Sequence, residues 1–369
     1  RLLQGLTAAI LYPQVLSLIR VTFAAGPERA RAFAVWGAAA GFAGVIGQML
    51  GGFLAEANLG GLGWRPLFLI NIPIGVAALI ASPRFIAESR SPAAQRLDLA
   101  GVAFGAIALG LLLYPLIEGR EAGWPAWSLI MLALALPALA IFGLHQHRRS
   151  QRSAQPLLDT SLFGDRAFTI GLLLTLTFYS TLNSSFLAFA FFIQAGLHRS
   201  PFDAGLIFST LAVAFAATSI LSRRITAERR RFWLAIGAVV ALIGSALAAA
   251  TPFIAPNIAE AMIPAMVVIG VGEGLFMMQL LNAVISSIHD RHAGSAAGVL
   301  STMQQVGGAI GVAIVGLLFF GALDRARTVG LADAAAYGQA LAAAFAYCVA
   351  ALAATLGLLA ALPRASAQS

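Results

Sequence analysis

The stretch FWLAIGAVVALIGSALAAA, residues 232–250, contains no charged side chain and a single hydroxyl group. It follows the arginine cluster Arg229–Arg231 and ends shortly before Pro252. About 20 apolar residues are long enough to cross the hydrocarbon core of a bilayer as a helix. Backbone groups cannot remain unpaired in hydrocarbon, so such a segment must be helical. This stretch therefore predicts a membrane-spanning helix.

Similar apolar segments recur along the whole chain, separated by short polar breaks. They lack the period-two alternation that would indicate a transmembrane β-barrel. The sequence therefore predicts an all-α polytopic membrane protein with eleven transmembrane helices in this chain. The predicted spans are 2–23, 30–55, 66–83, 97–118, 127–144, 168–194, 203–222, 231–250, 258–285, 294–322 and 337–362.

The composition excludes an ordinary soluble protein. Charged residues make up 10% of the chain, hydrophobic residues 60%, and the mean hydropathy is +0.87. Soluble domains carry roughly 25% charged residues, and a charge this sparse cannot coat a soluble surface. The single cysteine, Cys348, excludes an intramolecular disulfide and a cysteine-based metal site.

The net charge of +8 comes from arginine alone, because the chain contains no lysine. Nucleic acid is not a predicted partner, since the arginines lie in short clusters between apolar runs, as in membrane-protein loops. Alternate loops must face the same side, and seventeen arginines fall on one side against five on the other. By the positive-inside rule the richer side is cytoplasmic. The poorer side holds Arg65, Arg120, Arg199, Arg325 and Arg327.

Several motifs resemble those of a known transporter family. Arg1-Leu2-Leu3-Gln4-Gly5, followed by Pro13, resembles the fourth-helix motif of the major facilitator superfamily. Residues 47–52, Gly-Gln-Met-Leu-Gly-Gly, resemble its fifth-helix antiporter motif, with Gln48 where that motif has proline. Trp64-Arg65, Ile70-Asn71 and Pro73-Ile74-Gly75 match the segment that follows in the drug:proton antiporters.

Two later motifs extend the resemblance over essentially the whole chain. Residues 96–101, Arg-Leu-Asp-Leu-Ala-Gly, resemble the entry to the extra helix pair of the fourteen-span branch. Gln304-Gln305, Gly307-Gly308 and Gly311 resemble its penultimate helix. The resemblance implies the major facilitator fold, with the first three of fourteen helices lying outside this chain.

The resemblance also implies a division into four parts. Residues 1–96 would be the remainder of the N-terminal helical bundle, and 97–144 the extra transmembrane pair. Residues 145–167 would form a cytoplasmic linker, and 168–369 a six-helix C-terminal bundle. The linker contains His145 and His147 without acidic or cysteine partners nearby in the sequence, so no metal site is predicted.

One acidic residue, Glu273, lies deep in a predicted span, within Gly270-Val271-Gly272-Glu273-Gly274. Burying an acid in hydrocarbon is costly without a use, and such acids commonly relay protons. Glu273 is therefore the first candidate for proton coupling. The alternative is a structural hydrogen bond from a protonated carboxyl group. For Arg1 the resemblance implies a role in proton coupling, and the alternative is an interfacial arginine.

Two further groups of residues are candidates for transport. Gly47, Gly51 and Gly52, with Gln48 among them, make part of the helix over 30–55 nearly free of side chains, which suits close or sliding helix packing. Polar side chains within the spans could bind cargo, although they could also join helices by hydrogen bonds. The cargo-pathway candidates are Gln4, Tyr179, Asn183, Gln279 and Gln304.

The sequence thus predicts a secondary active transporter in the cytoplasmic (inner) membrane, crossing it many times. It would export lipophilic or cationic small molecules, such as drugs, in exchange for protons. A dedicated exporter of one metabolite, siderophore or antibiotic is the alternative, and a membrane-embedded enzyme or scaffold lies outside this class. No enzyme motif and no cofactor site is found, and ATP drive through a Walker sequence needs a lysine that is absent. Cargo, protons and lipid are the predicted partners, and a periplasmic adaptor stays open.

Overall fold

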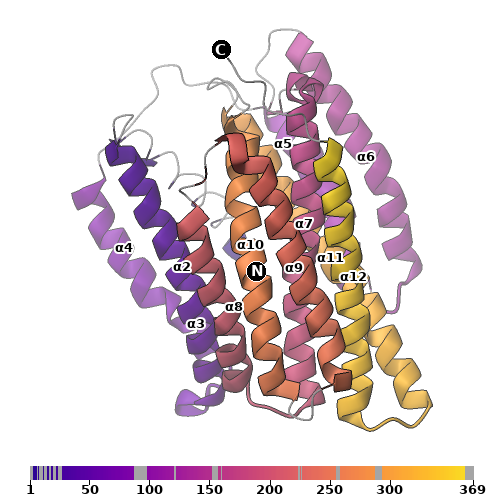
Figure 1. Ribbon diagram of the computed structural model, residues 1–369. Helices are drawn as coiled ribbons and strands as arrows, with labels where there is room; N and C mark the ends of the chain where they lie inside the picture. Colours follow the sequence, from indigo (N-terminus) through magenta and orange to yellow (C-terminus); the bar gives the residue numbers. More distant parts are fainter. Residues whose placement is uncertain are drawn as a thin grey trace. The chain divides into compact units, whose positions relative to one another are not determined.

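The computed structural model describes residues 27–86, 98–119, 122–151, 157–158, 160–222, 225, 227–254, 258–286 and 293–361, with scattered positions among the first 23. Within these residues the regular structure is helical throughout (Figure 1). The chain divides into two compact units, Arg1–Ala94 and Gln95–Ser369.

The first unit contains α2 (Pro27–Glu56), α3 (Pro66–Leu69) and α4 (Asn71–Phe85). The predicted span over 66–83 corresponds to α3 and α4, which are separated by a turn at Ile70. The Asn71 side chain donates to the carbonyl oxygens of Leu67 and Phe68 at 3.5 and 3.4 Å. Backbone acceptors at the turn are thereby partnered, which a break within a membrane requires.

The second unit contains eight long helices. The N-caps of three of them are acidic or hydroxyl side chains that accept a backbone N–H, namely Asp98, Asp165 and Ser200. Helix α7 is followed directly by a π-helical turn over Phe192–Gly196. The helices are α5 (Leu99–Glu118), α6 (Ala126–Gln151), α7 (Arg166–Phe191), α8 (Pro201–Leu221), α9 (Arg230–Ile254), α10 (Ile258–Ser286), α11 (Ala293–Thr328) and α12 (Asp333–Ala361).

These helices pack in a consistent pattern. Helix α10 lies between α8 and α9, while α11 packs against α7 and α12. Helix α12 also contacts α9 and α7, and α5 packs against α6 and α11. Phe178 of α7 and Phe276 of α10 are fully buried, with ring centroids 4.6 Å apart. The core of the C-terminal helices is built from aromatic and aliphatic side chains of all six helices from α7 to α12.

Glycine permits the closest of these helix contacts. A Cβ at Gly270 or Gly274 of α10 would meet the backbone carbonyls of Leu211 and Phe215 on α8. On the other side of α10, a Cβ at Gly272 would meet the backbone of Ala241 on α9. Small residues let helix backbones approach closely in membranes, so these glycines set the position of α10.

The all-α polytopic fold is confirmed. Nine helical segments of the described residues are long and apolar enough to cross a membrane, namely α3–α4 together and each helix from α5 to α12. Ten predicted spans coincide with described helices, whereas most of the span over 2–23 lies outside the described residues. Helix α6 runs on to Gln151, past the predicted start of the linker at residue 145. The four-part division itself stays a prediction.

Candidate functional site

Glu273 lies near the middle of α10 with 5% of its surface exposed. Asp98 and Glu273 are the two buried acidic residues in the described part of the chain. The carboxyl group of Glu273 makes no hydrogen bond or ion pair with another described residue. The glycines on either side of it pack against α9 and α8. The acid is therefore held in place by its own backbone and not by a polar partner.

Two side chains from other helices reach the same place. The Cys348 thiol of α12, with 1% exposure, lies near enough to the Glu273 carboxyl group to interact with it electrostatically, and the Ser184 side chain of α7 lies near the thiol. Ser184 is itself buried, and its hydroxyl donates to the carbonyl oxygen of Thr181 at 3.1 Å. We call Ser184, Glu273 and Cys348 the α7–α10–α12 junction. Among these three buried side chains the carboxyl group is the strongest potential charge.

Further polar contacts join α7 to α12 at positions that precede Ser184 on α7. The Tyr347 hydroxyl donates to Ser180 Oγ at 2.9 Å, and the Thr355 hydroxyl donates to Thr177 Oγ1 at 2.9 Å. Side-chain hydrogen bonds between transmembrane helices are each worth about 0.6–2 kcal/mol. The contacts therefore fix the register of α7 on α12 around Glu273.

A polar surface follows α7 and α11. Asn183 is exposed and Tyr179, one turn earlier on α7, is half-buried. A Cβ at Gly308 of α11 would collide with the Asn183 amide nitrogen, so these two residues are neighbours. A Cβ at Gly307 would meet the backbone carbonyl of Leu176, and a Cβ at Gly311 would meet that of Ser180. The contacts advance in the same direction on both helices, so α7 and α11 run in parallel.

Three predicted cargo residues lie on this pair of packed helices. Gln304 of α11 is half-buried and lies one turn before Gly308. We call Tyr179, Asn183 and Gln304 the α7–α11 polar face. An exposed amide is poorly accommodated by lipid, so a face containing Asn183 is better suited to a water-containing pathway.

Other predicted site residues lie elsewhere. The Gln279 amide is buried, and its nitrogen donates to the Ser222 carbonyl oxygen at 2.9 Å, which ties α10 to the end of α8. Gln4 is exposed in the first unit, and Arg1 lies outside the described residues. The Gln279 amide is therefore used at the end of α8 and is not part of the α7–α11 polar face.

The predicted antiporter-motif residues all lie on α2. Gly52 is buried, and Gly51 faces the Leu67 side chain of α3, which a Cβ would meet at 3.5 Å. A Cβ at Gly47 would meet no atom of the described residues within 4 Å. Gln48 is half-buried. The motif thus packs α3 at one end and presents open surface at the other within its unit.

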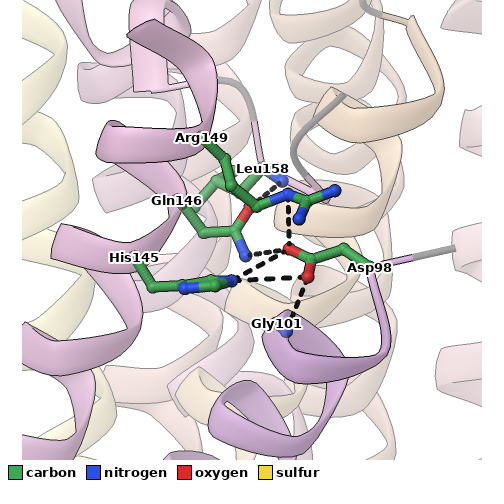
Figure 2. Close-up of polar contacts among 6 residues, drawn as sticks. All are labelled: Asp98, Gly101, His145, Gln146, Arg149 and Leu158. Carbon is green, nitrogen blue, oxygen red and sulfur yellow. Dashed lines mark hydrogen bonds and ion pairs between the residues drawn. The ribbon is translucent and has the colours of Figure 1, made fainter. Parts of the chain in front are cut away.

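One polar site was not predicted from the sequence. Asp98, His145, Gln146 and Arg149 converge at the start of α5 (Figure 2). Within the described residues, no group of three or more histidine, cysteine or acidic side chains could hold a metal ion.

The sequence model of the Major Facilitator Superfamily matches residues 1–312. The chain belongs to this superfamily. It is 34% identical over 345 residues to a protein named probable actinorhodin transporter from Streptomyces coelicolor, covering 91% of this chain and 58% of that protein. It is 31% identical to the puromycin resistance protein pur8 of Streptomyces alboniger, covering 96% of this chain and 71% of the relative.

A third relative is the multidrug resistance protein Stp of Mycobacterium tuberculosis, 27% identical over 85% of this chain and 57% of that protein. The chain thus spans somewhat more than half the length of two of these relatives. The resemblance to the drug-efflux members of the superfamily is confirmed. The chain is a multi-pass protein of the cytoplasmic membrane, and its family is one of transporters and not of enzymes.

Proposed function

We propose that the protein containing this chain is a proton-coupled exporter of lipophilic, antibiotic-like small molecules, with all eleven predicted helices of this chain crossing the membrane. The observation that carries the proposal is the position of Glu273, a buried acid without a polar partner among the described residues other than the Cys348 thiol. Relatives named for actinorhodin transport, puromycin resistance and multidrug resistance support the cargo class.

Protonation of Glu273 would act on the packing of α7, α10 and α12. A neutral carboxyl group can remain in the buried junction, whereas an ionised one needs water or a cation beside it. Loss of the proton would therefore favour a state in which the junction opens, and uptake of a proton would favour the closed state. A ligand or proton shifts such an equilibrium only through its different affinity for the two states.

The α7–α11 polar face is the proposed cargo contact on this chain. Tyr179 offers an aromatic ring with a hydroxyl group, and the amides of Asn183 and Gln304 offer both donors and acceptors. Phe186 lies one turn beyond Asn183, with its ring centroid 4.0 Å from that of Phe208 on α8. Such a mixture suits a flat, largely apolar molecule with a few polar groups.

A dedicated exporter of one compound is the second candidate. The relative with the highest identity among those named above carries the name of a single antibiotic, actinorhodin. The two candidates differ in the breadth of cargo and not in the mechanism, and a periplasmic adaptor is compatible with both.

The test is uptake of fluorescent lipophilic compounds into everted membrane vesicles containing the product of the full reading frame. The interior of such vesicles is acidified by respiration, so an exporter driven by proton exchange concentrates the compound inside. We expect uptake that stops when a protonophore is added, with vesicles lacking the protein as the control. Uptake of several unrelated compounds indicates a multidrug exporter, and uptake of one indicates a dedicated exporter. Uptake unaffected by the protonophore contradicts proton coupling.

The cargo face is tested by Asn183→Leu, which removes the amide at little change in volume. Loss of one hydrogen bond to cargo, about 0.5–1.5 kcal/mol, raises the half-saturating cargo concentration roughly 2- to 12-fold. The measurement is the concentration dependence of vesicle uptake. Leu173→Ala, at an exposed apolar position of the same helix, is the matched control and is expected to leave this concentration unchanged. Equal effects of the two variants would remove Asn183 from the cargo pathway.

A further inference from the structure

Asp98 stands immediately before α5, with 4% of its surface exposed. Its Oδ1 accepts the backbone N–H of Gly101 at 3.0 Å, which caps the helix. His145 Nε2 lies 3.3 Å from the same oxygen, and Arg149 Nε lies 3.3 Å from Oδ2 (Figure 2). One carboxylate thus joins the first turn of α5 to the last turns of α6.

Gln146 extends the contact to the next segment of the chain. Its side chain is fully buried, and its Nε2 donates to Asp98 Oδ2 at 3.1 Å. Its Oε1 accepts the backbone N–H of Leu158 at 3.1 Å (Figure 2). We call Asp98, His145, Gln146 and Arg149 the Asp98 cluster.

Gly101 leaves the space that this cluster needs. A Cβ at this position would collide with the Asp98 carboxylate and with the Gln146 amide. At Gly110, two to three turns further along α5, a Cβ would meet no atom within 4 Å. Gly101 and Gly110 therefore differ sharply in how much they matter for packing.

The cluster holds Asp98 ionised. Burial disfavours the charged form, but the hydrogen bonds from Gly101, His145 and Gln146 and the charge of Arg149 outweigh it, so the pKa of Asp98 lies below its ordinary value of 3.8. Because the pKa is lowered, this stabilising contribution is present above pH 3.8 and is lost only as the pH falls through the lowered pKa. Asp98 is therefore ionised at neutral pH.

The same end of α6 is attached to the C-terminal helices. His147 Nδ1 lies 3.2 Å from the Thr160 hydroxyl, in the 3-10 turn Thr160–Gly164 that precedes α7. Leu162 of this turn is buried in one core cluster with Phe168 and Phe178 of α7. Helix α5 also packs against α11. The α5–α6 pair is thus joined to the C-terminal helices by polar and apolar contacts.

We infer that Asp98 positions Gln146, whose Oε1 accepts the Leu158 N–H, and that the Asp98 cluster thereby fastens the α5–α6 pair to the C-terminal helices, so that the pair moves with them during transport. The α5–α6 pair then changes its distance to α4 of the first unit during transport and keeps its distance to the C-terminal helices. The inference rests on the proposed function in one respect, namely that the protein alternates between two conformations that open to opposite sides of the membrane. It concerns which helices move together, whatever the cargo and whatever the coupling ion.

The test is distance measurement between spin labels on the full reading-frame product in lipid nanodiscs, with Cys348 replaced by serine. The label positions are Leu79 on α4, Leu136 on α6 and Ile254 on α9, which are 73%, 72% and 74% exposed. All distances are measured under two solution conditions, selected so that the Leu79–Ile254 distance differs between them. We expect the Leu136–Ile254 distance to stay constant between these conditions and the Leu136–Leu79 distance to change.

Variants then assign the attachment to the cluster. Gly101→Ala and Asp98→Ala are each expected to replace the single narrow Leu136–Ile254 peak by a broad or shifted distribution. Gly110→Ala is the matched control and is expected to retain the narrow peak. If one of these two variants does not fold, the distance distribution of the other tests the inference. A constant Leu136–Leu79 distance, a Leu136–Ile254 distance that changes in the wild type, or cluster variants that behave like Gly110→Ala would each overturn the inference. These distances are measured without any transport assay, so they can be interpreted even if the protein does not export cargo.

Discussion

Proton-driven uptake into everted vesicles is expected to fall to the level of vesicles without the protein when Glu273 is replaced by glutamine. Glutamine has nearly the shape of glutamic acid, and the glycines beside residue 273 continue to set the position of α10. The amide cannot take up or release a proton, so a proton gradient no longer acts on the α7–α10–α12 junction. Exchange of labelled for unlabelled cargo, measured without a gradient, is expected to persist because it needs no net proton movement.

The matched control is Glu260→Gln in the first turn of the same helix. Glu260 Oε1 lies 3.1 Å from Arg199 Nη2, and both side chains are about half exposed. Exposed ion pairs contribute about 0–1 kcal/mol, so this substitution is expected to leave uptake nearly unchanged. If the Glu273→Gln variant retains full proton-driven uptake, a group other than Glu273 couples transport to protons. Arg1 is then the remaining candidate from the sequence.

The membrane helices are predictable because hydrocarbon imposes one rule on every span. Each helix from α5 to α12 coincides with an apolar run in the sequence. The apolar runs do not predict where a helix departs locally from α-helical geometry. The π turn over Phe192–Gly196 follows an unbroken apolar stretch, and a Cβ at Gly196 would meet the Tyr337 side chain of α12. The turn thus depends on a partner from a distant part of the chain.

The candidate site was only partly predictable for a similar reason. Glu273 stands out in the sequence because an acid within an apolar run is costly. Gln279, in contrast, was selected by residue type alone, and its amide is used at Ser222. The Asp98 cluster joins Asp98 to residues that are 47 to 51 positions away in the sequence, and only the antiparallel pairing of α5 and α6 brings them together.

Gly311→Ala is expected to destabilise the protein by about 1–3 kcal/mol, the cost of forcing an extra group into a packed interface. A Cβ at Gly311 of α11 would overlap the backbone carbonyl of Ser180 on α7, and a backbone atom cannot move aside by changing a rotamer. Separation of the two helices would also strain the hydrogen bond from Tyr347 to Ser180. The measurement is thermal unfolding of the purified protein in detergent.

Gly321→Ala, on the same helix, provides the comparison, since a Cβ there would meet no atom within 4 Å. Alanine favours helix over glycine by up to about 1 kcal/mol, so this variant is expected to be equal to or slightly more stable than the wild type. The same intrinsic gain applies at Gly311, which makes the difference between the two variants a direct measure of the α7–α11 contact. Equal unfolding temperatures would mean that α7 and α11 separate at little cost, and Asn183 would then have no fixed position from which to meet cargo.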